Sequence, residues 1–200
     1  MNSSKYKLTF VHIPKVAGGS IQRANIPFKV LGHDIRKKEF KYLKDIKKSP
    51  NEFIFAFVRN PWDRCLSAFR WVSSGGNNNN DERDARQYLG EHRGDFSAFI
   101  KHCKDCDKFL EQVHFQPQHK WICDDHDNAL VDFIGRFENL QEDFNKLCDT
   151  VEIPRKKLMH HKKPKLKRKH YTECYNEETK QIVAEKYKKD INFFDYKFGE

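Results

Sequence analysis

Two apolar runs near the start of the chain, residues 8–12 and 53–58, are each followed by a polar turn and then by residues at helical spacing. Continuous apolar runs of this length are typical of parallel strands that are buried on both faces. Strands that alternate with helices in this way indicate a sheet covered by helices. The pattern therefore predicts an α/β protein with a central parallel sheet flanked by helices.

The rest of the pattern of apolar and polar positions predicts the other elements of this fold. These are strands at residues 28–31 and 130–135, helices at residues 19–25, 35–47, 61–72, 140–147 and 177–190, and helical segments over much of residues 84–122. Residues 73–84 contain two adjacent glycines and four consecutive asparagines, a composition that predicts a flexible loop. Such a loop is either a lid over a substrate or a tolerated insertion.

The helix predicted at residues 61–72 has a clear start signal, and both this helix and the last predicted helix have positions that should face the core. Asn60 is a plausible N-cap, Pro61 suits the first helical position, and Asp63 suits the positive first turn. Apolar residues recur at helical spacing in both helices, and we expect them to be buried: Cys65, Leu66, Phe69 and Val72 in the first, and Val183, Tyr187, Ile191 and Phe194 in the last.

The turn after the first strand has the residue types of a phosphate-binding loop. Lys15 supplies a positive charge, Gly18 and Gly19 let the backbone turn closely around a ligand, and Ser20 offers a hydroxyl at the start of a helix. In P-loop nucleoside triphosphatases the lysine directly follows the last glycine instead. The sequence therefore predicts a three-layer fold of the P-loop type whose loop differs from that of ordinary kinases.

The second strand, residues 53–58, is followed by Arg59, where a kinase or GTPase would carry an aspartate for magnesium. Arg59 precedes the next helix and Ser67 lies two turns into it, so that the two residues are spaced to grip one phosphate together. This turn therefore predicts an anion site without a metal ion. Two anion sites on one scaffold suggest a ligand with two charged ends.

At these residues the chain resembles the sulfotransferases that use 3′-phosphoadenosine 5′-phosphosulfate (PAPS), most closely the Golgi-type carbohydrate sulfotransferases of the heparan and chondroitin kind. Their loop reads roughly His-Ile-Pro-Lys-Thr-Gly-Gly-Thr-Ser, and its counterpart is residues 12–20, with Val16-Ala17 in place of the usual Thr-Gly. Their second signature, an arginine followed eight residues later by a serine, corresponds to residues 59–67. The resemblance implies that the 5′-phosphosulfate is held by Lys15, Ala17, Gly18, Gly19 and Ser20, and the 3′-phosphate by Arg59 and Ser67.

The resemblance continues beyond these two motifs. Residues 114–118, 131–140 and 187–196 look like landmarks of the family, in the family's order. The similarity therefore covers nearly the whole chain, and it implies one sulfotransferase domain over residues 1–200.

Sulfuryl transfer needs stabilisation of the charge on the departing phosphate oxygen and a base for the acceptor hydroxyl. Lys15 is suited to the first task. For the base we expect His33, because similar glycan 2-O-sulfotransferases carry a catalytic Gly-His between the two cofactor motifs and imidazole titrates near neutral pH. The alternative is that His33 only caps the following helix or lies in solvent. We expect His12 to pack at the strand end, and His114 and His119 are secondary candidates on the acceptor side.

The chain is basic, with 38 Lys and Arg against 29 Asp and Glu and a formal net charge of +9 over 200 residues. This excess favours anionic ligands without identifying one. Residues 155–170 are especially rich in Lys and Arg, and they either contact the cofactor, recruit an acidic glycan or form a mobile charged loop. Aromatic residues are not interleaved with these charges, so no nucleic-acid partner is expected. The expected acceptor is a carbohydrate or another hydroxyl compound.

Two other classes of function are open. One is an atypical P-loop kinase for a nucleotide or metabolite, although the order of Lys15 and the glycines, and the presence of Arg59, argue against it. The other is a non-enzymatic basic module that binds polyanions or nucleic acid. The joint presence of Lys15, Arg59 and Ser67 argues against such a degenerate loop.

No segment approaches eighteen consecutive apolar residues, and the first residues are polar. We therefore expect no membrane segment and a cytoplasmic protein, with an excised Golgi-lumenal catalytic domain as the alternative. The six cysteines are compatible with free thiols. No metal is expected, although a zinc-like spacing is shared by Cys103, Cys106, Cys123 and His126.

Overall fold

The computed structural model describes residues 7–32, 51–76, 79–159 and 169–200. The chain divides into two compact units. The first unit consists of Met1–Arg59 and Gln118–Lys163, and the second of Asn60–Pro117 and Pro164–Glu200. A single domain over residues 1–200 stays a prediction.

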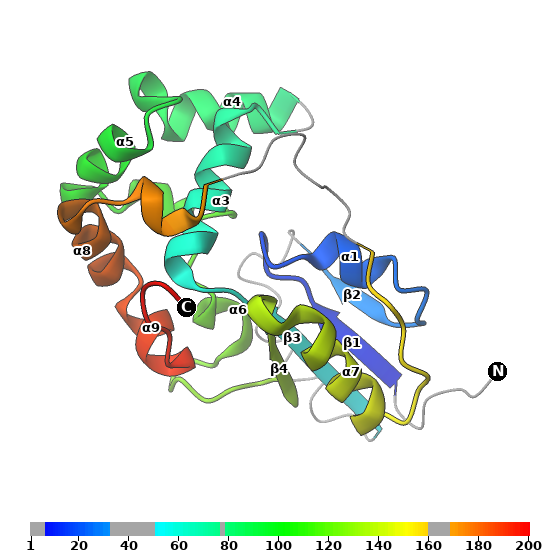
Figure 1. The fold of residues 1–200 in the computed structure, drawn as a ribbon. Helices are drawn as coiled ribbons and strands as arrows, with labels where there is room; N and C mark the ends of the chain where they lie inside the picture. Colours follow the sequence, from blue (N-terminus) through cyan, green and yellow to red (C-terminus); the bar gives the residue numbers. More distant parts are fainter. Residues whose placement is uncertain (1–6, 33–50, 77–78, 160–168) are drawn as a thin grey trace. The chain divides into compact units, whose positions relative to one another are not determined.

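The first unit is built around a parallel sheet. Its described strands are β1 (Lys7–Val11), β2 (Lys29–Leu31), β3 (Glu52–Val58) and β4 (Phe133–Arg136), in the order β2-β1-β3-β4 (Figure 1). Every neighbouring pair is parallel. The central strands β1 and β3 are buried over most of their length, which explains their continuous apolar sequences. The predicted α/β fold with a central parallel sheet flanked by helices is confirmed.

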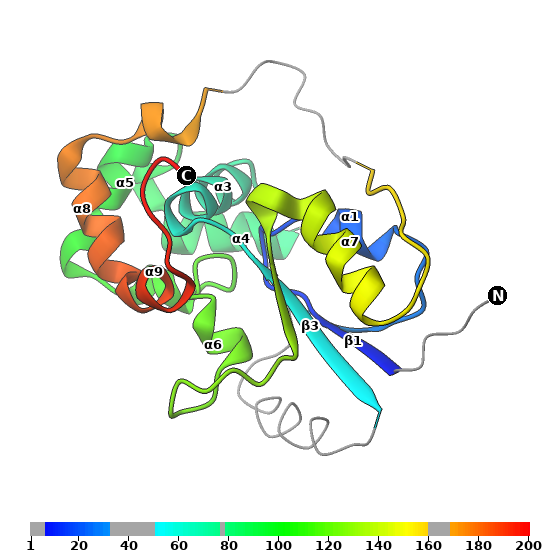
Figure 2. The ribbon, with the colours of Figure 1, turned by 60° about the horizontal axis from the view of Figure 1, so that its bottom comes forward.

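The helices of the first unit are α1 (Gly18–Gln22), α6 (His119–Ile122) and α7 (Leu140–Thr150). In Figure 2, α1 and α7 both lie above strands β1 and β3. The helix predicted at residues 19–25 is shorter than expected, because Asn25 has a left-handed φ of 53° that an α-helix does not allow. The helix predicted at residues 35–47 lies outside the described residues.

Strand β4 begins later than the apolar run at residues 130–135 predicts. Leu130 and Val131 are buried, yet the Leu130 N–H donates to the Ile122 carbonyl at 2.7 Å instead of joining the sheet. Asp132 is bonded to Ile54 twice, since its N–H donates to the Ile54 carbonyl and its carboxylate accepts from the Ile54 N–H, at 2.7 and 2.8 Å. Apolar burial therefore begins before strand pairing in this segment.

The second unit is helical. Its described helices are α3 (Pro61–Ser73), α4 (Asn79–Tyr88), α5 (Phe96–His102), α8 (Glu177–Lys186) and α9 (Lys188–Phe194). Single 3₁₀ turns lie at Gly90–His92, Cys103–Asp105, Lys108–Glu111 and Tyr171–Cys174, and in the first unit at Phe137–Asn139. Aromatic rings form the core of the second unit, where the ring centroid of Phe99 lies 5.3, 5.4 and 5.8 Å from those of Phe69, Phe115 and Phe109.

The predicted start of α3 is confirmed in detail. The Asn60 side chain accepts from the Trp62 N–H at 3.2 Å and donates to the Lys197 carbonyl at 2.8 Å, and Pro61 occupies the first helical position. The predicted core positions of this helix and of the C-terminal helices are buried, with Ile191 partly buried.

Two helical boundaries differ from the predictions. The loop predicted at residues 73–84 is wrong in its second half, because α4 already begins at Asn79 and has Asp81 and Glu82 in its positive first turn. The single helix predicted at residues 177–190 is divided at Tyr187, which ends α8 with φ −112° and ψ 22°. The Tyr187 hydroxyl is buried and donates to the Phe115 carbonyl at 2.7 Å.

Among the described residues, none of the helices combines the length and the apolar character needed to cross a bilayer.

Candidate functional site

The loop that follows β1 contains two left-handed residues that are not glycine. Lys15 has a φ of 71° and Ala17 a φ of 65°. Ala17 is the N-cap of α1, and its carbonyl accepts from the N–H groups of Ser20 and Ile21 at 2.8 and 3.2 Å. Left-handed backbone costs a residue with a Cβ about 1–2 kcal/mol, so this loop holds a conformation that the residues themselves disfavour.

The imidazole of His12 fills the space beside Gly18. A Cβ at position 18 would overlap the His12 ring. The ring stacks on Phe10 with centroids 5.5 Å apart, and its Nδ1 lies 3.1 Å from Gln22 Nε2. His12 therefore has the packing and hydrogen-bonding contacts expected of it, and Gly18 is needed because the loop passes directly against this ring.

Arg59 lies against the Lys15 loop. Strands β1 and β3 are parallel neighbours, with Val11 in register with Ala56, so both turns start at the same edge of the sheet. Arg59 Nη1 donates to the Lys15 carbonyl at 3.0 Å. The guanidinium carbon also lies 4.0 Å from the centroid of the Phe137 ring. The two motifs predicted as anion sites therefore touch within the first unit.

Gln118 holds the backbone of Arg59. Its side-chain oxygen accepts from the Arg59 N–H at 2.9 Å, and its Nε2 donates to the Arg59 carbonyl at 2.7 Å. The Gln118 side chain is fully buried. From the sequence, no role is predicted for Gln118, and Phe137 is expected to be structural. Each lies in a stretch resembling a family landmark, and this is the signal that pointed to them.

Lys15, Gly18, Ser20 and Arg59 are thus brought together in the first unit; Gly18 and Ser20 are buried, and Lys15 and Arg59 are half-buried. Ser67 lies on α3, in the second unit. His33 lies outside the described residues, as do residues 160–168 of the basic stretch. The functional roles of all these residues stay predictions.

His114 is buried in the second unit and braced by Gln112. The Gln112 side-chain oxygen accepts from the His114 N–H at 2.7 Å, which fixes the orientation of the amide. Gln112 Nε2 then faces His114 Nδ1 at 3.0 Å and Asp84 Oδ2 at 3.3 Å, so Nδ1 accepts. A neutral His114 ring therefore carries its proton on Nε2. His119, by contrast, begins α6 in the first unit.

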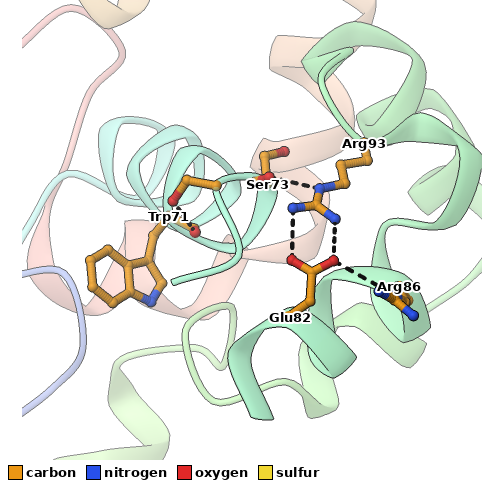
Figure 3. Close-up of polar contacts among 6 residues, drawn as sticks. Trp71, Ser73, Glu82, Arg86 and Arg93 are labelled. Atoms are coloured by element: carbon orange, nitrogen blue, oxygen red, sulfur yellow. Dashed lines mark hydrogen bonds and ion pairs between the residues drawn. The ribbon is translucent and has the colours of Figure 1, made fainter. Parts of the chain in front are cut away.

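Ion pairs and a hydrogen bond connect the end of α3 with the start of α4 (Figure 3). Arg93 donates from Nη1 and Nη2 to the two oxygens of Glu82 at 2.7 and 2.9 Å, and from Nε to the Ser73 carbonyl at 2.8 Å. Arg86 also reaches Glu82, at 3.4 Å. Hydrogen bonding to Arg93 lowers the pKa of Glu82. These contacts tie the start of α4 to the end of α3.

All six cysteines are free thiols. Burial raises the pKa of Cys65 to about 12 and also raises the pKa of Cys103, so both thiols resist ionisation. Cys103 and Cys106 belong to the second unit, whereas Cys123 and His126 belong to the first. Among the residues that the structure describes, no group of three or more His, Cys, Asp or Glu could hold a metal ion.

Comparison with known proteins adds independent information. The chain matches the sulfotransferase family over residues 1–197. It is 25% identical to carbohydrate sulfotransferase 14 of Mus musculus and 26% identical to that of Homo sapiens, in each case over 76% of this chain and 46% of the relative. The chain thus spans about half the length of the curated relatives it matches. No solved structure shows significant similarity.

The family match extends over nearly all of the sequence, including both turns at the edge of the sheet. The family indicated by residues 12–20 and 59–67 is therefore confirmed, and the chain belongs to the sulfotransferase family.

Proposed function

We propose that this chain transfers a sulfuryl group from PAPS to a hydroxyl of a carbohydrate acceptor by in-line displacement. The acceptor oxygen forms a bond to sulfur while the bond between sulfur and the bridging phosphate oxygen breaks. The acceptor proton passes to a base, and adenosine 3′,5′-bisphosphate leaves. The names of the two relatives, both carbohydrate sulfotransferases, support a carbohydrate as the acceptor.

One observation carries this proposal: Arg59 and the Lys15 loop meet at one edge of the sheet, with 3.0 Å between Arg59 Nη1 and the Lys15 carbonyl. Two cationic side chains, in the turns that follow two adjacent parallel strands, suit a ligand with an anionic group at each end. In open α/β sheets, ligands bind outside the carboxyl ends of the strands, and that is the edge at which these residues lie.

The proposed roles follow from the residue types. Lys15 neutralises the charge that develops on the bridging oxygen of the departing bisphosphate. The backbone from Ala17 to Gly19 and the Ser20 hydroxyl hold the phosphosulfate oxygens. Because α1 has only five residues, we assign the binding mainly to these groups and to Lys15 rather than to the helix dipole. Arg59 and Ser67 hold the 3′-phosphate.

His33 is the proposed base. His114 is less suited to that task, since its Nδ1 accepts from Gln112 and its neutral ring therefore presents an N–H at Nε2. We expect His33→Ala to abolish transfer while affinity for adenosine 3′,5′-bisphosphate survives, and His126→Ala, at an exposed histidine, to leave both unchanged as a control. Full turnover of the His33 variant would move the role to another residue.

Calorimetric titration tests the function itself. The ligands are adenosine 3′,5′-bisphosphate, ATP with magnesium, and an oligonucleotide. The proposal requires that the bisphosphate bind most tightly and that Arg59→Ala weaken it. Preference for ATP with magnesium would favour a kinase instead. Binding of the oligonucleotide alone, with a steep dependence on salt, would favour a polyanion-binding module.

A further inference from the structure

Arg59 is held on three sides within the first unit. Its backbone is bonded twice by Gln118, its guanidinium lies over the Phe137 ring, and its Nη1 donates to the Lys15 carbonyl. A guanidinium has five N–H donors, so one arginine has enough donors for both a carbonyl and a phosphate. A residue that served only as a phosphate ligand would not need the contact with the loop.

The contact with Lys15 falls on a strained part of the loop. Lys15 has a φ of 71°, and the hydrogen bond from Arg59 stabilises the peptide group that follows it. In a trans peptide the carbonyl and the next N–H point in opposite directions. Because Arg59 holds the Lys15 carbonyl pointing toward its guanidinium, the Val16 N–H of the same peptide group points away from Arg59. Arg59 therefore fixes the orientation of a backbone donor in the phosphate loop.

Gln118 supplies the backbone hydrogen bonds that Arg59 does not receive from the sheet. The pairing of β3 with β4 ends at Val58 and Arg136, one residue before Arg59. The buried Gln118 amide then bonds both backbone groups of Arg59, at 2.9 and 2.7 Å. The Arg59 Cα is thereby fixed at the end of the strand. Phe137 restricts the guanidinium further, because the cation lies over the face of its ring.

We propose that Arg59 organises the Lys15 loop in addition to binding the 3′-phosphate, and that Gln118 is the positioning residue that keeps Arg59 in place for both tasks. The two ends of the nucleotide site are then coupled, since one side chain supports both. This inference rests on the proposed function, because it assumes that the loop receives the 5′ end of an adenosine bisphosphate.

Two ligands separate the two roles of Arg59. Adenosine 3′,5′-bisphosphate uses both ends of the site, whereas adenosine 5′-phosphate lacks the 3′-phosphate. If Arg59 only binds the 3′-phosphate, Arg59→Ala leaves the affinity for adenosine 5′-phosphate unchanged. We expect that affinity to fall about three- to tenfold, since a hydrogen bond from a charged donor is lost from the loop. Affinity for the bisphosphate should fall further, by roughly a hundredfold.

A double-mutant cycle tests Gln118. In the wild-type background, Gln118→Met should weaken adenosine 5′-phosphate about threefold, because Arg59 is no longer fixed. In the Arg59→Ala background the same substitution should change that affinity by less than about twofold, because the side chain through which it acts is gone. A purely structural role predicts equal effects in both backgrounds. Gln116→Met, two residues earlier, is the matched control and should leave affinity unchanged.

Amide hydrogen exchange without any ligand gives a second measurement. Arg59→Ala should speed exchange across residues 13–19 relative to the wild type, and thermal unfolding of each variant shows that it is folded. Unchanged adenosine 5′-phosphate affinity in Arg59→Ala would refute the coupling alone. A wild-type chain that binds neither nucleotide would refute the proposed function, and the coupling with it.

Discussion

Two of the turns that use left-handed backbone, one in each unit, are built from different residues. After β1 the left-handed positions are Lys15 and Ala17, with φ of 71° and 65°. After α3 they are Gly75 and Gly76, with φ of 77° and 58°. Glycine adopts this conformation at little steric cost, whereas a residue with a Cβ does not. Of these two turns, the strained one is thus at the candidate site, and the one built from glycines follows α3.

The contacts that hold the two turns differ in the same way. The turn at Lys15 is held by Arg59, which is itself fixed by the buried Gln118. The turn at Gly75 is held by the pair of Glu82 and Arg93, whose side chains are each 35% exposed. Exposed ion pairs are screened by water and contribute little. We therefore expect changes that displace the backbone of the first turn to affect ligand binding, and changes in the second turn to affect stability alone.

Gly18→Ala should have the largest effect. The new Cβ would overlap the His12 ring, so either the ring or the loop must move. We expect the free energy of unfolding to fall by about 1–3 kcal/mol, as for overpacking, and the affinity for adenosine 3′,5′-bisphosphate to fall at least about tenfold. Denaturant unfolding and calorimetry measure the two quantities.

A second substitution shows whether the ring is the cause. His12→Ala removes the obstacle, so the double variant should be less destabilised than the sum of the two single variants. Additive effects would mean that Gly18→Ala acts through something other than His12.

Gly75→Ala is the corresponding change in the second turn. Position 75 has a positive φ, and a Cβ there would meet the Glu82 carboxylate. We expect a loss of about 1–2 kcal/mol in the free energy of unfolding, with affinity for the bisphosphate unchanged. A loss of affinity as large as that of Gly18→Ala would end the distinction between the two turns.

The sequence predicts most of the first unit because its information there is local. Apolar runs specify β1 and β3, and a lysine before two glycines in the loop after a strand is a local pattern that predicts the candidate anion site. The contact between Arg59 and Gln118 could not be predicted in this way. It joins residues 59 positions apart through a side-chain amide, and no local pattern records such a pairing.

The two wrong helix boundaries also arise from contacts that no local pattern in the sequence records. The composition of residues 73–84 predicts a loop, yet acidic residues at positions 81 and 82 favour a helix start there, and Arg93 stabilises it from eleven residues away. The periodicity of residues 177–190 continues through Tyr187, but the hydrogen bond of its hydroxyl to Phe115 is a tertiary contact. Periodicity identifies the buried face of a helix and not a break within it.

Glu82→Gln tests the ion pair of the second turn. Arg93 holds the pKa of Glu82 below its ordinary value in the folded chain. The pair therefore stabilises the fold above the unfolded-state pKa, and this stabilisation is lost as the pH falls through the lower folded-state pKa. We expect the variant to be less stable than the wild type at neutral pH, and the difference to shrink in acid. Urea unfolding at several pH values measures it, with the exposed Glu111→Gln as the control.

Ala17→Gly should have the smallest effect. It gives the first turn a glycine at a left-handed position, as the second turn has. The change relieves the strain of a Cβ at a φ of 65°, but it also gives the unfolded chain more conformational freedom. These terms nearly cancel, so we expect a gain or loss in the free energy of unfolding of less than about 1 kcal/mol. Because Ala17 N–H and carbonyl groups keep their positions, affinity for adenosine 3′,5′-bisphosphate should not change. A large loss of affinity would show that the Ala17 Cβ is needed to keep the loop in its binding conformation.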